Sequence, residues 1–269
     1  MKKTLILLLS IFLFSNIVMA GPFCIKEPVC IREPEKGLYI IKINTKQYSV
    51  KPYIIEEGFE TSENVFNNNK FELVVNGGYF DFKNKKTVSF VMKDGKVILD
   101  PQQNEHLSDN PSIKDYVDLI YNRGELRRLD CNGEIKYDIL KHYDVVKEGC
   151  KITDSLQAGP ILYPENKSDE EFFTKKDENG NLTRNAIQGN YKKPRTAVAI
   201  KNNNIYFIIA TREYPMTLDE IAQLGKKHNF DKILNLDGGG STSFTNKEYN
   251  IKSEANGTQR RVKSFLVVE

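Results

Sequence analysis

Short apolar runs separated by tight turns are the feature that most restricts how this chain can fold. Three runs are rich in the β-branched and aromatic residues that favour strands: residues 38–43, 47–55 and 71–75. Within 89–99, Asp94 and Gly95 separate two more runs, and this dipeptide suits the type I′ turn of a hairpin. An asparagine-rich turn at 201–204 separates another pair. The sequence therefore predicts a chain built mainly from β-hairpins.

One amphipathic helix is predicted at residues 217–230. Thr217 and Glu220 have the spacing of a capping box, in which each side chain accepts a hydrogen bond from the other residue's N–H. Apolar residues follow at helical spacing: Leu218, Ile221, Ala222 and Leu224. Strand-like runs flank the helix, so we expect it to pack on a sheet. Together these elements predict an α+β fold: a single domain with a mixed β-sheet, several hairpins and few packed helices.

Residues 1–20 have the pattern of a secretory signal peptide. Two lysines precede an apolar run, and small residues at 18–20 form a cleavage site. A transmembrane anchor is the alternative, but it needs about 20 mostly apolar residues, and Ser15 and Asn16 interrupt the end of this run. The sequence thus predicts a secreted or periplasmic protein without stable membrane insertion after cleavage.

The charge balance excludes partners that depend on a strong field. The chain has 39 basic and 36 acidic residues, and removing the two lysines of the signal leaves 37 against 36, a net charge of +1. Such a surface does not attract nucleic acid or an anionic membrane. The chain shows neither an internal repeat nor a linker rich in proline, glycine and serine, which favours one domain.

Four cysteines lie beyond the signal segment: Cys24, Cys30, Cys131 and Cys150. An even number in an oxidising compartment favours disulfides, and proximity in sequence suggests the pairs Cys24–Cys30 and Cys131–Cys150. Zinc is the competing interpretation. Neither cysteine spacing is typical of a zinc site, and the three histidines are scattered along the chain: His106, His142 and His228.

The segment 166–185 is charged and rich in asparagine. Two interpretations are open: a mobile surface loop, which we favour, and a lid over an active site.

In the stretch ILNLDGGGSTSF at 233–244, an apolar run is followed directly by an aspartate and three glycines. A P-loop would need Gly-Lys-Ser/Thr, a dinucleotide fingerprint would need a longer chain beyond it, and a serine nucleophile would need a later histidine. A flexible linker would not interrupt a core. We therefore expect a rigid turn that lets backbone N–H groups approach a ligand beside Asp237. Its remaining members are Gly238, Gly239, Gly240, Ser241 and Thr242.

The same design occurs earlier, at 73–82, where LVVNGGYFDF leads a strand into Asn76, Gly77, Gly78 and then Asp81. One glycine turn after a strand is a weak signal, because glycines after strands commonly just make loops. Two such turns in one chain are more specific.

The motifs taken together resemble the phosphodiester glycosidase family. They are NGGYFD at 76–81, QAGPIL at 157–162, PRTAVAI at 194–200, the helix after TREYPMT, LNLDGGGST at 234–242 and the closing RRVKSFLVV. The resemblance covers 65–269, which we take as the catalytic-type domain, after N-terminal strands and a disulfide-bearing segment at 21–64. The family commonly has Asp-Gly-Arg where this chain has Ala210-Thr211-Arg212, and whether Glu213 replaces the missing carboxylate is open.

The resemblance implies an exported hydrolase that removes a sugar from a glycosyl phosphodiester. Two carboxylates commonly act in glycoside hydrolysis. A phosphate leaving group is already acidic, so neutralising its charge matters more than protonating it. Arginine supplies that charge through a planar, bidentate group. Three arginines lie in the matched motifs: Arg195, Arg212 and Arg261. For each of them a structural salt bridge is the alternative.

Asp237 is the first candidate for the catalytic carboxylate, with Asp81 and Glu213 as partners and Arg195 beside the leaving group. The substrate-binding candidates are Asn76, Gly77, Gly78, Arg212, Gly238, Gly239, Gly240, Ser241, Thr242 and Arg261. A cap on its own glycine turn is the structural alternative for Asp237. Tyr79 and Phe80 could face a sugar or pack in the core.

A function of another class uses the same residues. A secreted binding module for an anionic cell-wall or capsular polysaccharide would need the glycine turns and the arginines, but no turnover. A calcium ion held by Asp237 and neighbouring carbonyl groups would fit either function, since hard cations take oxygen ligands.

Overall fold

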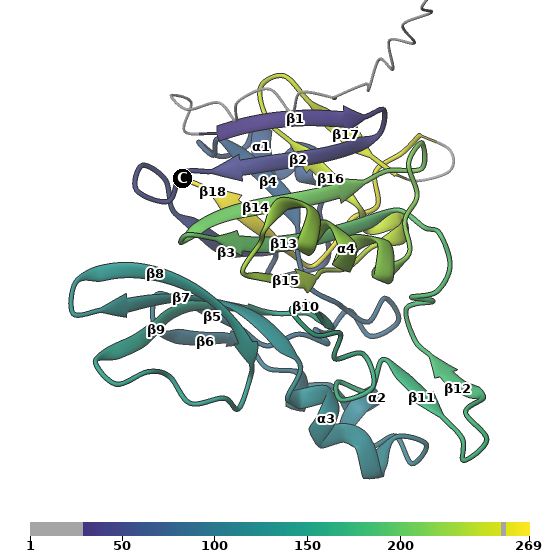
Figure 1. Ribbon diagram of the computed structural model, residues 1–269. Coiled ribbons are helices and arrows are strands. Elements are labelled where there is room, and N and C mark those ends of the chain that lie inside the picture. The colour runs from purple at the N-terminus through teal and green to yellow at the C-terminus, as the bar shows by residue number, and fades with distance from the viewer. Residues whose placement is uncertain (1–28, 254–256) are drawn as a thin grey trace, which may run out of the picture.

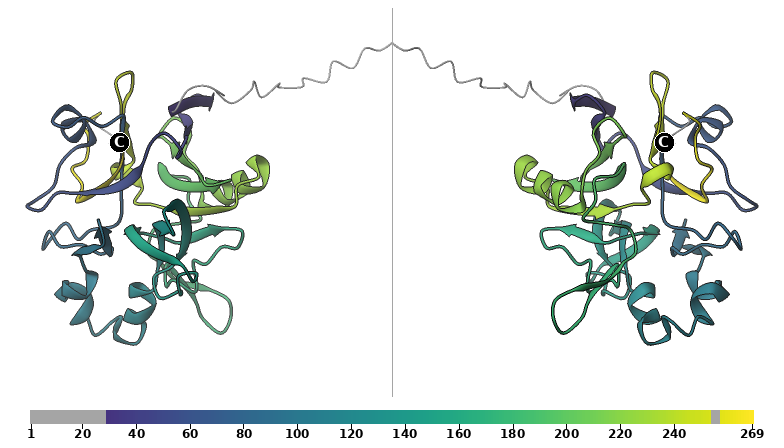
Figure 2. Two further views of the ribbon diagram at one scale, coloured as in Figure 1. Left: turned by 90° about the vertical axis from the view of Figure 1, so that its left-hand side faces the viewer. Right: turned by 90° about the vertical axis from the view of Figure 1, so that its right-hand side faces the viewer.

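The computed structural model describes residues 29–253 and 257–269. The predicted signal peptide and Cys24 lie outside these residues. Strands are the commonest regular element of the described structure, and helices are few and short. Figure 1 shows two upper sheets above a lower one, and the side views in Figure 2 place the teal part of the chain beneath the upper strands.

The six-stranded sheet has the order β1-β2-β14-β13-β15-β10. The bounds of its strands are Val29–Glu35 (β1), Leu38–Ile43 (β2), Ile161–Tyr163 (β10), Arg195–Lys201 (β13), Asn204–Ala210 (β14) and Lys232–Asn235 (β15). Both faces of this sheet are buried. Ile205, Phe207 and Ile209 of β14 face a core shared with the other sheets. Tyr206 and Ile208, which alternate with them, face the helix α4.

The second upper sheet has five strands in the order β17-β16-β4-β18-β3. Their bounds are Val50–Ile54 (β3), Leu73–Asn76 (β4), Ser243–Thr245 (β16), Asn250–Lys252 (β17) and Ser264–Val268 (β18). This sheet places the ends of β4, β16 and β18 around one point, where Asn76, Ser243 and Ser264 lie.

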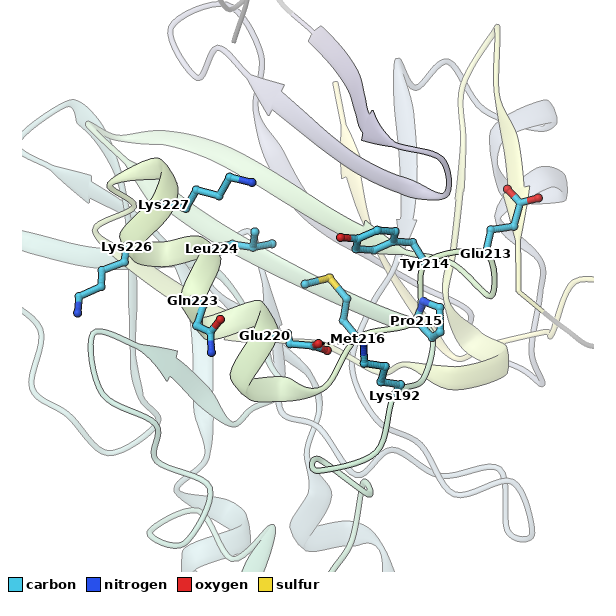
Figure 3. A pocket seen from close by; sticks show the side chains of 10 residues that line it. All are labelled: Lys192, Glu213, Tyr214, Pro215, Met216, Glu220, Gln223, Leu224, Lys226 and Lys227. Carbon is cyan, nitrogen blue, oxygen red and sulfur yellow. Dashed lines mark ion pairs between the residues drawn. The ribbon is translucent and has the colours of Figure 1, made fainter. Parts of the chain in front are cut away.

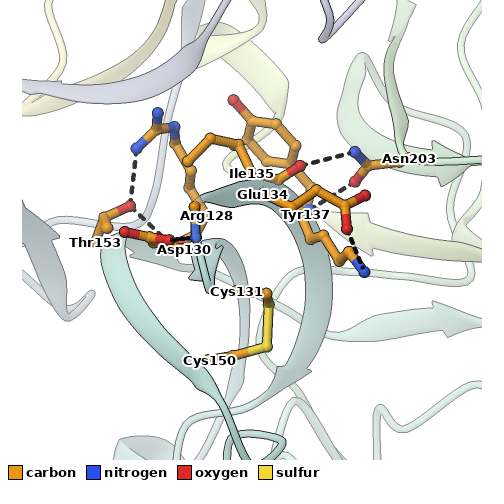
Figure 4. Close-up of a disulfide and its surroundings, with 11 residues drawn as sticks. Arg128, Asp130, Cys131, Glu134, Ile135, Tyr137, Cys150, Thr153 and Asn203 are labelled. Carbon is orange, nitrogen blue, oxygen red and sulfur yellow. Dashed lines mark hydrogen bonds and ion pairs between the residues drawn. A yellow bond between two sulfur atoms is a disulfide. The ribbon is translucent and has the colours of Figure 1, made fainter.

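The lower sheet also has five strands, in the order β6-β5-β9-β7-β8. Their bounds are Val91–Lys93 (β5), Lys96–Leu99 (β6), Gly124–Cys131 (β7), Glu134–Lys141 (β8) and Cys150–Gln157 (β9). Cys131 and Cys150 lie opposite each other in the pairing of β7 with β9 and form a disulfide (Figure 4), which confirms this predicted pair. Cys30 is also disulfide-bonded. Its predicted partner, Cys24, is outside the described residues.

The four α-helices of the described chain are Ser62–Asn67 (α1), Glu105–Ser108 (α2), Val117–Tyr121 (α3) and Leu218–His228 (α4). Three 3-10 turns accompany them: Pro101–Gln103 (η1), Lys114–Tyr116 (η2) and Gly239–Ser241 (η3). The predicted capping box of α4 is present: Thr217 Oγ1 accepts from the Glu220 N–H at 3.1 Å, and Glu220 Oε2 accepts from the Thr217 N–H at 2.8 Å. No helix within the described residues is long and apolar enough to cross a membrane.

Both predicted hairpins are confirmed. Asp94 and Gly95 have φ of +49° and +74°, as a type I′ turn requires. Asn202 and Asn203 turn β13 into β14, also with positive φ.

The mixed sheet that we expected is wrong, because every strand pairing in the described chain is antiparallel. The strand–helix–strand pattern around α4 suggested parallel neighbours. However, β13 lies between β14 and β15 and pairs antiparallel with both.

The segment 166–185 is more ordered than a surface loop. It contains the hairpin of Thr174–Lys176 (β11) and Leu182–Asn185 (β12). Glu171, Phe172 and Phe173 just before it are buried.

Candidate active site

Asp237 lies just beyond β15, where the two glycine turns meet. Its N–H donates to the Gly77 carbonyl oxygen at 3.0 Å, and its own carbonyl oxygen accepts from Asn76 Nδ2 at 2.7 Å. Its Oδ1 accepts from the Gly238 N–H at 2.9 Å. The structure thus joins the turn at 76–81 to the turn at 237–242, although 160 residues separate them in sequence.

The carboxyl of Asp237 is held in an unusual electrostatic state. Burial raises its pKa to about 6, against the opposing effects of the Ser241 hydroxyl, the Gly238 N–H and the positive charge of Arg260. The Ser241 hydroxyl lowers the pKa as a hydrogen-bond donor to the carboxyl, although the contact lies outside strict hydrogen-bond geometry and Ser241 Oγ has no other partner within the described chain. A carboxyl with this pKa can be charged or neutral near pH 6. Such a shifted pKa is more typical of a group that takes part in a reaction than of a purely structural carboxyl.

Two buried hydroxyl groups occur in the turn that carries Asp237. Ser241 Oγ and Thr242 Oγ1 are buried and have no hydrogen-bond partner within the described chain. Buried polar groups in folded proteins are nearly always satisfied, so these two require an explanation, as do the four other buried side-chain atoms that lack a partner among the described residues, at Arg128, Ser155, Asn235 and Ser253.

The glycine N–H groups of the first turn are already hydrogen-bonded within the protein. The N–H groups of Gly77 and Gly78 donate to the backbone and side-chain oxygens of Ser264. A Cβ on Gly77 would lie 2.8 Å from the Ser264 carbonyl oxygen, and one on Gly78 would lie 2.5 Å from Ser89 Oγ. These glycines are required for close packing of strand ends, so the expectation that they cradle a ligand does not agree with this conformation.

Asn76 is also committed to the protein. Besides its bond to Asp237, its Oδ1 accepts from Thr196 Oγ1 at 2.8 Å and from the Ser243 N–H at 3.0 Å. Asn76 therefore ties β4, β13 and β16 to the turn that carries Asp237. It positions the site and does not present its amide to a sugar.

Two further residues extend this network: Tyr79, which from the sequence could face a sugar or pack in the core, and Asn235, which the sequence did not single out. Tyr79 donates its hydroxyl to the Gly159 carbonyl oxygen at 2.8 Å and accepts from Asn235 Nδ2 at 2.8 Å. Burial raises the pKa of Tyr79, as does the charge of Asp237. Gly159 lies in the motif QAGPIL, so this motif meets the other two at Tyr79. The tyrosine hydroxyl could not be assigned from the sequence because its partner is a backbone oxygen.

The predicted arginines are in three different situations. Arg195 is buried and donates to the carbonyl oxygens of four residues: Ile187, Gln188, Tyr191 and Met216. Burial lowers its pKa. Arg212 is exposed and its Nε donates to the Ser253 carbonyl oxygen at 2.6 Å. Arg261 is 65% exposed and lies 4.0 Å from Glu60. Its neighbour Arg260 is the one whose charge acts on Asp237. Because Arg260 and Arg261 are adjacent in the sequence RRV, the sequence alone could not tell which of them acts on Asp237.

The other two predicted carboxylates do not join Asp237 through any hydrogen bond in the described structure. Asp81 pairs with His106 Nδ1 at 2.6 Å. Partial burial opposes its ionisation, but the hydrogen bonds from His106 and from the Lys83 N–H outweigh this and hold its pKa below the usual value.

Glu213 pairs with Lys36 at 2.9 Å. It lines a groove of about 730 Å³ beside α4, shown in Figure 3. In that view its carboxylate points away from the helix. The structure gives no support to Glu213 as a replacement for the carboxylate that the family commonly has after this strand.

No group of three or more His, Cys, Asp or Glu side chains that could hold a metal ion occurs in the described parts of the chain.

Comparisons with known proteins find the same fold elsewhere. The chain has the same fold as the catalytic domain of zebrafish N-acetylglucosamine-1-phosphodiester alpha-N-acetylglucosaminidase, auto-inhibited by its pro-peptide: TM-score 0.63, 16% identity, 89% of this chain and 81% of that one covered. A putative exported protein from Burkholderia pseudomallei is similar at TM-score 0.62 and 13% identity, covering 86% of this chain and 73% of that one.

A hypothetical protein from Synechocystis is similar at TM-score 0.60 and 14% identity, covering 89% of this chain and 61% of that one. A comparison with curated protein sequences found no match. The sequence model of the phosphodiester glycosidase family matches residues 69–269, which include both glycine turns. The chain therefore belongs to the phosphodiester glycosidase family.

Proposed function

We propose that this protein is an exported hydrolase that cleaves the glycosidic C–O bond of a glycosyl phosphodiester, with phosphate as the leaving group. The observation that carries the proposal is the state of Asp237: a carboxyl with a pKa of about 6, in a turn with two buried hydroxyls and within the field of an arginine. Export is supported by the disulfide, by the pattern of residues 1–20 and by the similarity to the Burkholderia exported protein.

Asp237 performs the central step in its ionised form. The carboxylate stabilises positive charge at the anomeric carbon as the C–O bond breaks, or takes a proton from the attacking water. Ser241 and Thr242 donate their free hydroxyls to sugar hydroxyls or phosphate oxygens. Because phosphate leaves as a stable anion, a second carboxylate acting as general acid is not required, which agrees with the separate positions of Asp81 and Glu213.

The departing phosphate is stabilised by positive charge. Arg260 is the cation that acts on Asp237, and in our proposal it contacts the phosphate, as Arg212 does from the exposed side. Arg195 is too thoroughly bound to backbone carbonyls to reach the substrate. Its charge also acts on Tyr79, so it contributes through the field in the site and through the loop that it fixes.

Hydrolysis in water enriched in the heavy oxygen isotope tests the proposal. We expect the label on the released sugar, which shows C–O cleavage. Label on the phosphate would make the protein a phosphodiesterase, and binding without turnover would make it a polysaccharide-binding module. The same assay with and without a chelator determines whether calcium takes part.

A further inference from the structure

Three phenylalanines, two partly buried and one exposed, form a cluster at the first glycine turn. Phe59, Phe80 and Phe82, here called the phenylalanine platform, have ring centroids 4.8 to 6.1 Å apart. Phe59 and Phe82 are stacked with 21° between their planes, and Phe82 is 64% exposed. A large apolar side chain held at the surface by two other aromatic rings commonly has a binding role, since exposed apolar patches tend to mark binding sites.

The platform is fixed to the protein from below. Phe80 packs on the buried cluster that contains Val262 and Phe265. Its backbone also pairs with Thr87. Glu60, next to Phe59, pairs with Val262. The rings are therefore held in place by two strand-like segments and do not depend on a ligand for their arrangement.

The arginines of the candidate active site lie beside the platform. Arg260 acts on Asp237, Arg261 lies 4.0 Å from Glu60, and Val262 pairs with Glu60 next to Phe59. The turn that carries Phe80 and Phe82 is also the turn whose Gly77 carbonyl oxygen accepts from the Asp237 N–H. A platform that shares one turn and one basic segment with the catalytic carboxyl suits a single molecule that has an anionic group next to an apolar group.

Phenylalanine has no polar atom in its side chain, so the platform offers an occupant contact area without hydrogen bonds. A hydrocarbon chain would lose no hydrogen bond on such a surface, whereas a sugar would use only its C–H face there and its hydroxyls would depend on water. We propose that the phenylalanine platform binds an apolar aglycone, the alcohol esterified to the far side of the substrate's phosphate. The substrate class is then a glycosyl phosphate ester of a hydrocarbon alcohol. This inference rests on the proposed function.

Two substrates with the same sugar test the platform: the methyl and the octyl ester of one glycosyl phosphate. We expect the protein to hydrolyse the octyl ester with a kcat/KM at least about tenfold higher, from burial of the chain. Phe82→Ala should lower the octyl-to-methyl ratio by about tenfold, chiefly through KM, since one contact face is lost. Tyr143→Ala is the matched control, because Tyr143 is also an exposed aromatic residue, 53% exposed, on the lower sheet side. It should leave the ratio unchanged.

A ratio near one in the unaltered protein, or a ratio that Phe82→Ala does not change, would overturn the inference. If neither ester is hydrolysed, the proposed function fails and the platform is tested alone by calorimetry with octyl phosphate and methyl phosphate. Stronger binding of octyl phosphate that Phe82→Ala removes would support the platform, and equal binding would refute it. Sedimentation with phosphatidylcholine vesicles, lost in Phe82→Ala without any chain-length preference, would assign the rings to membrane contact and also overturn it.

Discussion

The two glycine turns are alike in sequence and different in their electrostatics. Each follows a strand, contains consecutive glycines and carries an aspartate. Asp81 in the first turn is paired with His106 near the surface and has a lowered pKa. Asp237 in the second turn is half-buried, has a raised pKa and shares its turn with two buried hydroxyls, of Ser241 and Thr242. Burial and local partners, more than the motif itself, decide which carboxyl is prepared for chemistry.

The first turn serves the second. Asn76 and Gly77 bind the backbone of Asp237, and the N–H groups of Gly77 and Gly78 are used within the protein. The difference suggests a division of labour in which one turn supports and the other acts, and changes in each turn can test it.

The largest effect is expected at Asp237. Asp237→Asn should reduce kcat at least about a hundredfold, because the uncharged amide can neither stabilise a cation nor accept a proton. The folded-state pKa lies above that of the unfolded chain, so the stabilising contribution is present below pH 4 and is lost as the pH rises through 6. At pH 7 the charge costs up to about 3 kcal/mol.

Thermal melting checks this prediction alongside kinetics. At pH 7 the melting temperature of Asp237→Asn should equal or exceed that of the unaltered protein. A variant that retains activity would remove Asp237 from the chemistry, and one that loses activity only because it has unfolded would return it to a structural role.

The adjacent arginines provide the next comparison. Arg260→Met should lower kcat by roughly one to two orders of magnitude, since a cation acting on Asp237 and the leaving phosphate is lost. Arg261→Met removes the same charge one residue away, where the side chain is 65% exposed, and should change kcat less than about threefold. Steady-state kinetics on both variants checks the pair. Equal losses would show that net charge and not position matters.

The pH profile gives a smaller but direct test of which turn acts. If ionised Asp237 is required, kcat should fall about tenfold per pH unit below about 6. A requirement for ionised Asp81 would place the fall below pH 4, because its pKa is lowered. Turnover measured between pH 4 and 8 separates the two, and a flat profile across pH 6 would contradict the role given to Asp237.

The sequence predicted the local features of this fold better than the contacts of the site. Capping at Thr217, the turns at Asp94 and Asn202, and the pairing of Cys131 with Cys150 depend on neighbours in the chain or on spacing, and all are present. The partners of Asn76 and the difference between Arg260 and Arg261 depend on which strand ends meet. No local sequence pattern encodes which strand ends meet, so the partners of Asn76 and the role of Arg260 could be found only from the structure.

The smallest effect is expected at Asp81, where a large loss of activity would directly contradict the difference between the two turns. Asp81→Asn should change kcat less than about threefold, because its carboxylate is occupied by His106 and the Lys83 N–H and stays near the surface. Its lowered pKa means that the stability it contributes is present above pH 4 and is lost as the pH falls through the folded-state pKa. The variant should therefore lose about 0.5 kcal/mol at pH 7, the size of an exposed polar pair, and progressively less as the pH falls below 4. Chemical denaturation of Asp81→Asn, His106→Gln and the double variant measures the pair. A loss of kcat above about thirtyfold with this small loss of stability would show that both turns act, and the two carboxyls would then have to be treated as partners.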